Sequence, residues 1–403
     1  FRRVLFRSIQ GDQSHVQSLH VMGALSIEAG VFTVNEKEGI TNTVSRLTTQ
    51  VSEALSGSGN LTLTGKGSEI KGTNKGFSGA VTLGSDSTTT IHDATGLGRG
   101  DIEIYGTLSA DLAANANDFE SVFTGTGTFS VTSGSAKITS DISSFTGDGT
   151  KLGGRFVLGN GTAISVQSAE QKVALDVSGT DTGTGTFSFT GKGTQRTQVS
   201  FTNAAFNGTA EFTNTQILGS AYAASGSTLV LKDGSAYTAD AKDLSLAGLT
   251  VDGSKLAFSS SAVPGTTETE NLLKVNGALE FKANSTVDVA SGIIQKLTLE
   301  KGQGNLLEQD DNAEHAITLA TASGGVINVE NAKLTVDRTE VTGGEQTFKI
   351  GADPNNIDAI GTYGYKLSDA NNKLAVTYGL KALEVTEGRS ITLGQYGDGD
   401  SRS

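Results

Sequence analysis

One tripeptide in the chain has the residues of a known attachment motif. Arg99-Gly100-Asp101 matches the integrin-recognition sequence of many host-matrix ligands. Recognition of that kind needs an exposed loop from which the guanidinium and the carboxylate can reach a receptor. Here the tripeptide leads directly into the alternating stretch Ile102-Glu-Ile-Tyr105, which is typical of a strand. Two interpretations therefore stand side by side: a cell-attachment site, or a corner in which glycine makes the turn.

The histidines and acidic motifs offer little for metal chemistry. None of His15, His20, His92 and His315 stands in a recognisable metal-ligand spacing, so we expect solvated or turn-side histidines. Gly397-Asp-Gly-Asp400 hints at calcium, but the tandem Gly-Gly-x-Gly-x-Asp nonapeptide is missing. The sequence therefore predicts no metal site and no cofactor.

Nucleophilic catalysis finds equally little support. The chain has no cysteine, which excludes thiolate nucleophiles, disulfides and cysteine-ligated zinc. No Gly-x-Ser-x-Gly elbow occurs, and Gly399-Asp-Ser401 lacks the context of one. The 43 Asp and Glu leave a glycan-cleaving enzyme as an alternative, but there is no Trp and only 7 Tyr to form sugar platforms. We predict no catalytic residues and hence a protein that is not an enzyme.

Charge and hydropathy exclude further classes. With 30 Lys and Arg against 43 Asp and Glu, the net charge is −13, which disfavours nucleic acid and anionic membrane surfaces as partners. No apolar run approaches the roughly 18 residues that a membrane-spanning helix needs. Residues 1–8, FRRVLFRS, differ in style from everything after them. Back-translated, they match a common sequencing-adapter sequence, so we interpret them as an artefact and begin the protein at residue 9.

The rest of the chain consists of short alternating runs closed by Gly, Asn or Asp. Asn60–Thr64, Gly79–Leu83 and Lys333–Asp337 each alternate apolar residues with polar ones, as strands with one buried face do. The chain has 53 Gly and only 2 Pro, which suits tight corners between strands that keep their ladder donors. These features predict an all-β protein.

Internal similarity indicates how these strands are arranged. The stretch beginning Gly57-Ser-Gly59 recurs from Gly125 and from Gly183. An aromatic residue followed by a small residue and Gly comes 18, 18 and 21 positions after the second glycine of each copy, at Phe77, Phe145 and Phe206. An offset near about 20 residues corresponds to one turn of a solenoid, so equivalent residues are expected to stack in neighbouring rungs.

One segment has a different spacing. Ile40, Val44, Leu47, Val51 and Leu55 fall at helical intervals, although the Thr, Ser and Asn between them form helices poorly. A short helix on the flank of the solenoid is the alternative to a strand here.

At these repeats the chain resembles the passenger domains of Gram-negative autotransporters. Their passenger-associated repeat has a Gly-x-Gly-x-Leu-x-Leu stretch, an aromatic-x-Gly and a strand, then Leu-Gly-x-Gly before another strand. Here the corresponding residues are Gly57–Leu63, Phe77–Leu83, Leu97–Gly100 and Ile102–Leu108. The resemblance implies a right-handed single-stranded parallel β-helix over residues 9–403, with repeat units near 57–108, 125–175 and 183–232 and degenerate rungs over 233–403.

The same resemblance implies a function. Such a passenger is expected at the cell surface or outer membrane after export through the periplasm, or released from it, and acts as an adhesin or self-association module. Its expected partners are other bacterial cells, identical passengers, or host surface and matrix ligands, with a C-terminal β-barrel translocator that this chain does not contain. A glycan-cleaving β-helix enzyme, a passive surface spacer and a phage fibre remain alternatives.

Overall fold

Parallel strands dominate the computed structural model, which describes residues 20–28, 30–35, 40–180, 184–259, 273–293, 315–341, 345–353 and 356–389. Strands account for 57% of the chain and helix for 3%, and most strands join one long parallel sheet. This confirms the parallel β-helix. Contacts divide the chain into two compact units, residues 1–217 with 221–228, and residues 218–220 with 229–403.

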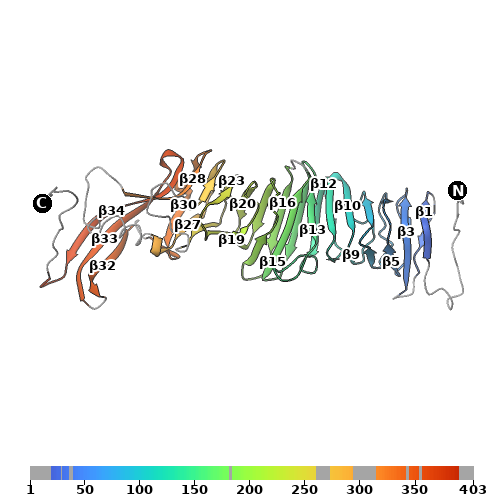
Figure 1. Cartoon of the computed structure of the whole chain (residues 1–403), viewed down its shortest axis with the longest axis horizontal. Coiled ribbons are helices and arrows are strands. Elements are labelled where there is room, and N and C mark those ends of the chain that lie inside the picture. The colour runs from blue at the N-terminus through green and yellow to red at the C-terminus, as the bar shows by residue number, and fades with distance from the viewer. Residues whose placement is uncertain are drawn as a thin grey trace. The chain divides into compact units, whose positions relative to one another are not determined.

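The first unit holds the most regular rungs (Figure 1). Its strands, the last of which also contributes residues 218–220 to the second unit, are β1 His20–Ile27, β2 Phe32–Thr33, β3 Thr41–Thr49, β4 Leu55–Ser56, β5 Asn60–Leu63, β6 Ser68–Ile70, β7 Val81–Leu83, β8 Thr88–Ile91, β9 Ile102–Ile104, β10 Thr107–Phe119, β11 Phe123–Thr124, β12 Thr128–Asp141, β13 Arg155–Leu158, β14 Ala163–Ser168, β15 Lys172–Gly179, β16 Thr186–Gly191, β17 Thr197–Phe201, β18 Thr209–Thr213 and β19 Thr215–Tyr222.

The second unit begins with parallel rungs and ends in an antiparallel sheet. Its elements are β20 Thr228–Lys232, β21 Ala236–Ala239, β22 Leu244–Leu246, β23 Gly248–Val251, β24 Lys255–Phe258, β25 Leu273–Val275, β26 Leu279–Phe281, β27 Ser285–Val289, β28 His315–Ala322, β29 Val326–Ile327, η2 Val329–Asn331, β30 Ala332–Val336, β31 Thr339–Glu340, β32 Glu345–Asp353, β33 Asn356–Ser368, η4 Ala370–Asn372 and β34 Lys373–Val385.

Register in the first unit follows the offset that the repeats predict. Leu61 on β5 pairs with Val81 on β7, which pairs with Ile102 on β9, which pairs with Phe123 on β11. Each step advances about one solenoid turn of roughly 20 residues. A second series runs from β6 through β8 and β10 to β12, also in parallel register. Because the apolar residue of each pair is buried, the stacked rungs enclose a continuous core.

Glycine at the corners allows the rungs to come this close. A Cβ added at Gly79 would overlap the carbonyl oxygen of Gly59, and one added at Gly100 would overlap that of Gly79. In the later repeat a Cβ at Gly208 would likewise overlap the carbonyl oxygen of Gly185. In these two repeats the second glycine of the Gly-x-Gly thus lies directly against the glycine of the following aromatic-x-Gly. This close backbone approach is the physical reason for the spacing of the two motifs.

The middle repeat departs from this arrangement because a loop is inserted. A Cβ at Gly147 would lie 2.6 Å from the carbonyl oxygen of Lys151, within the inserted loop itself. Gly154 takes the corner position instead, since the following residue Arg155 donates its backbone N–H to the carbonyl oxygen of Gly127 at 2.9 Å. The next rung therefore begins at β13, after the loop has closed.

Buried aromatic rings fill the centre of this unit. Phe123 and Phe129 have ring centroids 5.1 Å apart, Phe145 and Phe156 5.2 Å, and Phe156 and Phe187 5.4 Å. The first two pairs meet edge to face, the geometry that aromatic quadrupoles favour. The aromatic residues of the three repeats, Phe77, Phe145 and Phe206, are all fully buried.

The helical alternative for residues 40–55 is wrong. Residues 41–49 form β3, in which Val44 and Leu47 are buried and the residues between them are mostly not. The first half of β3 pairs with β5 and the end of it with β6. The pairing of β3 with two strands outweighs the helical spacing of its apolar residues, because the intervening Thr residues favour strands and the Ser and Asn residues form helices poorly.

The end of the second unit differs from the degenerate rungs expected over 233–403. Tyr237 pairs in parallel with Leu256, Leu256 with Val287, and Val287 with Leu334. Beyond them, β32, β33 and β34 pair in antiparallel fashion, and β34 is also antiparallel to β28. Stacked rungs therefore give way to a meander before the described residues end. Within those residues, no helix has the length and hydrophobicity that crossing a membrane requires.

The corner glycines generate a stability prediction. Gly79→Ala should lower the free energy of unfolding by about 2–3 kcal/mol, because the new methyl group must displace the backbone of the neighbouring rung. Urea unfolding followed by far-UV circular dichroism measures the change. Gly84→Ala is the matched control, since the nearest atom to its Cβ is the Leu63 carbonyl oxygen at 3.5 Å. Equal losses in the two variants would contradict the role assigned to the corner.

An unsatisfied hydroxyl inside the core generates a second prediction. Thr89 is 1% exposed, and its Oγ1 has no hydrogen-bond partner among the described residues. Thr89→Val should therefore raise the free energy of unfolding by about 1 kcal/mol in the same urea experiment. In the adjacent rung, the Ser68 hydroxyl accepts the Leu47 N–H at 3.0 Å, so Ser68→Ala should lower stability. A destabilised Thr89→Val variant would show that the hydroxyl has a partner after all.

Candidate functional site

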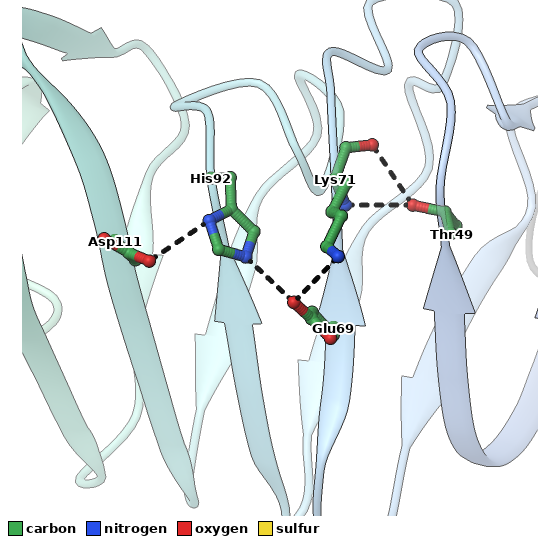
Figure 2. Close-up of polar contacts among 5 residues, drawn as sticks. All are labelled: Thr49, Glu69, Lys71, His92 and Asp111. Carbon is green, nitrogen blue, oxygen red and sulfur yellow. Dashed lines mark hydrogen bonds and ion pairs between the residues drawn. The ribbon is translucent and has the colours of Figure 1, made fainter.

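A row of charged side chains crosses several rungs of the first unit (Figure 2). Glu69 is on β6, Lys71 follows directly after it, His92 follows β8, and Asp111 is on β10. His92 Nε2 lies 3.2 Å from Glu69 Oε1, and His92 Nδ1 lies 3.3 Å from Asp111 Oδ2. Lys71 Nζ lies 3.5 Å from the same Glu69 oxygen. The parallel register places these residues side by side, and we call them the charged row.

A threonine on the preceding rung is bonded to the charged row. The Thr49 hydroxyl accepts the Lys71 backbone N–H at 3.2 Å and donates to the Lys71 carbonyl oxygen at 3.3 Å. Figure 2 shows Thr49 on β3, beside the strand that carries Glu69 and Lys71. Polar contacts thus link β3, β6, the turn after β8, and β10.

The two ring nitrogens of His92 face two different carboxylates. A neutral imidazole has one N–H, whereas the protonated ring donates from both nitrogens. Both nitrogens of His92 face a carboxylate oxygen, so only the protonated ring donates to Glu69 and to Asp111 at once. The ring is 28% exposed, so water can replace either contact.

The neighbours of Glu69 alter its acidity. Partial burial raises the pKa of the Glu69 carboxyl, but the hydrogen bond with His92 and the positive charge of Lys71 outweigh burial and hold that pKa below its ordinary value. Glu69, Lys71 and Asp111 all keep more than a third of their side-chain surface exposed. Solvent therefore screens these ion pairs, and each contributes little to stability.

The charged row does not form a metal centre. Among the described residues, no group of three or more His, Asp and Glu side chains could hold a metal ion. Glu69 and Asp111 approach opposite nitrogens of the His92 ring, and such an arrangement does not point three ligands at one ion. What the charged row offers is a line of partly exposed ionisable and polar side chains across neighbouring rungs.

The attachment tripeptide lies at a corner that leads into β9. The Arg99 backbone N–H donates to the Phe77 carbonyl oxygen at 2.9 Å, and the Asp101 carbonyl oxygen accepts the Val81 N–H at 2.8 Å. The Arg99 and Asp101 side chains are both exposed. Gly100 between them is one of the corner glycines described above. Steric need alone therefore accounts for Gly100, while two exposed charges flank it on a fixed backbone.

The outward face of β9 continues this line of polar groups. Tyr105 is 45% exposed, and its hydroxyl donates to Glu103 Oε1 at 2.7 Å. The Thr82 hydroxyl on β7 donates to the other oxygen of Glu103 at 3.2 Å. The hydrogen bond to Glu103 and the negative charge of that carboxylate raise the pKa of Tyr105. Asp101, Glu103 and Tyr105 alternate with the buried Ile102 and Ile104, so all three side chains lie on the outward face.

The other residues singled out from the sequence are not brought together. His20 lies in β1 and His315 in β28, in different units. His15, Gly397-Asp-Gly-Asp400 and Gly399-Asp-Ser401 lie outside the described residues.

The charged row was missed by sequence reasoning, which treated His92 as an isolated solvated residue. Glu69 and His92 are 23 positions apart, and no local motif joins them. A signal was present nonetheless, because His92 lies about one solenoid turn, roughly 20 residues, from an acidic residue on each side. Scanning for opposite charges at that interval would have found the row.

Comparisons of this chain with protein-family models, with curated proteins and with solved structures find no match. Its function is therefore inferred from its own residues and fold.

The lowered pKa of Glu69 can be tested by substitution. His92→Gln should move the Glu69 pKa upward toward its ordinary value, because the largest favourable partner of the carboxylate is removed. Carboxyl-carbon NMR titration measures the shift. Since the folded-state pKa is depressed, Glu69 contributes stability above its unfolded pKa and loses it as the pH falls through the folded value. That contribution should stay under about 1 kcal/mol at this exposure. An unchanged Glu69 titration in the variant would show that His92 is not its partner.

Proposed function

We propose that this chain is the surface-exposed passenger of an outer-membrane autotransporter and that it acts as an adhesin or a cell–cell self-association module. The carrying observation is the fold: stacked parallel rungs display outward side chains in register along β5 to β13. A protein built this way presents many similar contact points along a surface, so weak interactions add through avidity.

The passenger-associated repeat supports the proposed class. Its glycines lie where neighbouring backbones almost touch, and its aromatic residues are buried beside them. The glycines and the aromatic residue of that repeat thus have a structural use in this chain, at Gly59, Phe77, Gly79 and Gly100. The export route and the C-terminal β-barrel translocator are part of the proposal, and sequencing the gene on both sides of the region that encodes this chain tests them.

Charge constrains how identical passengers can associate. At a net charge of −13, two copies repel each other at long range. Close contacts must therefore come from hydrogen bonds and complementary local charges. The charged row supplies such groups, because Lys71 lies 3.5 Å from Glu69 and the His92 ring lies between Glu69 and Asp111. At the corner before β9, Arg99 and Asp101 supply a second exposed point of opposite charges.

The test displays residues 9–403 on a cell that does not aggregate by itself. We expect faster settling or stronger binding to host cells than an empty-vector control gives, because the displayed surface supplies many weak contacts. Asp101→Ala tests the attachment motif and should reduce host-cell binding several-fold if the tripeptide is used. Asp86→Ala is the matched control, since Asp86 is also an exposed aspartate in a turn of the first unit.

The outcomes separate the proposals. Neither settling nor binding above the control would defeat the adhesin function and favour a passive spacer. Binding that Asp101→Ala and Asp86→Ala leave equally intact would retire the attachment motif but keep the adhesin. Turnover of a polysaccharide, lost on substitution of a carboxylate pair, would replace both with an enzyme.

A further inference from the structure

Three asparagines in this chain are followed directly by glycine, and the fold gives them different surroundings. They are Asn160, Asn207 and Asn276, and all three asparagine side chains are exposed. In such a pair the backbone nitrogen of the glycine can attack the side-chain carbonyl carbon of the asparagine, because no side chain on the glycine obstructs it. The reaction also requires the main chain between the two residues to rotate, so backbone restraint decides which pair reacts.

Asn160 occupies the least restrained of the three positions. It lies with Gly161 in the exposed turn between β13 and β14, outside both strands. The turn is closed by Thr162, whose hydroxyl and N–H both donate to the Gly159 carbonyl oxygen, at 2.8 and 3.3 Å. A Cβ built on Gly161 would meet no atom within 4 Å. Gly159 and Thr162, on either side of the pair, make the hydrogen bonds to the neighbouring rungs, whereas Gly161 itself lies in open space.

A neighbouring hydroxyl also polarises the Asn160 amide. The Thr184 Oγ1–H donates to Asn160 Oδ1 at 2.5 Å. When a nitrogen adds to the amide carbon, negative charge develops on that same oxygen. A hydrogen-bond donor already placed there stabilises the addition, as an oxyanion-hole donor does.

The other two pairs are built into the ladder. The Gly208 carbonyl oxygen accepts the Thr228 N–H at 3.0 Å, and a Cβ there would overlap the Gly185 carbonyl oxygen. The Gly277 carbonyl oxygen accepts the Gly324 N–H at 2.9 Å, and its Cβ position lies 2.6 Å from a carbonyl oxygen of the adjacent rung. Rotation at either glycine breaks a ladder bond or drives backbone into backbone.

We propose that Asn160 is a self-modification site that deamidates selectively in the folded protein. The Gly161 nitrogen forms a bond to Asn160 Cγ and loses its proton, and the side-chain amide leaves as ammonia. Water then opens the resulting succinimide at one carbonyl or the other and yields aspartate or isoaspartate. Water is the only co-reactant, and no oxidant or reductant takes part.

The modification changes both charge and main-chain length at one turn. Either product adds one negative charge to a chain that already carries −13. Isoaspartate also inserts a methylene group into the main chain between β13 and β14. Because the site lies outside the strands, the ladder on both sides should survive. The isoaspartyl form is a substrate for the class of enzymes that methylate isoaspartyl carboxylates.

The experiment incubates the purified folded chain in mildly alkaline buffer at body temperature and follows it by tryptic peptide mapping. The three sites fall in separate peptides, residues 156–172, 197–232 and 275–282, so each mass gain of about one dalton is assigned directly. We expect Asn160 to convert at least several-fold faster than Asn207 and Asn276. Isoaspartate in peptide 156–172 is confirmed with an isoaspartyl methyltransferase.

Two controls separate the effect of the fold from that of the sequence. In concentrated urea the three sites should react at similar rates, since each then has only its glycine neighbour. Thr184→Val should slow Asn160 several-fold in the folded protein and leave the rates in urea unchanged. Asn207 or Asn276 reacting as fast as Asn160 in the folded chain, or an Asn160 that does not react, would overturn the proposal.

Discussion

The distance between neighbouring backbones governs this structure. Parallel strands joined by N–H to carbonyl hydrogen bonds lie about 4.8 Å apart. At a corner, where one backbone passes directly over the next, that separation leaves no space for a Cβ. Gly59, Gly79 and Gly100 occupy such positions, and Gly208 repeats the arrangement against the backbone of Gly185. Without these glycines the corners would separate, and the ladders on either side would lose their register.

The register of the strands in turn determines which side chains lie next to one another on the surface. In this β-helix, outward side chains on neighbouring rungs lie side by side, so polar groups come together on the surface without a pocket to hold them. The Glu69–His92–Asp111 contacts exist because β6, β8 and β10 are aligned, not because a loop was shaped to hold them. The same alignment fixes the backbone of Arg99 and Asp101, so this tripeptide is presented by a rigid corner.

Much of the fold could be predicted from local patterns, and the failures have physical causes. Period-two alternation predicted the strands, and the interval between Gly59 and Phe77 predicted the length of one solenoid turn. Alternation does not, however, specify the direction of a partner strand, so the antiparallel pairing of β33 with β34 was not foreseen. The charged row could not be predicted from local motifs, because its members are one solenoid turn apart in the sequence. Whether they come into contact depends on how the strands of neighbouring rungs are aligned. From the sequence, Gly100 fits both the attachment motif and a corner of the solenoid, because the sequence does not show which backbone segment of the neighbouring rung lies against it.

The pairing of strands in a parallel ladder depends on the order of the strands and not on the length of the chain that connects them. Phe129 and Phe156 pair although an inserted loop separates their rungs, and Val287 pairs with Leu334 although the chain between them is longer still. Such a protein can gain or lose surface loops without repacking its core. Sequence changes are therefore tolerated in the connections between strands, whereas the residues of the rungs are constrained by packing. Two homologues could differ widely in length and alignment and still share the same interior.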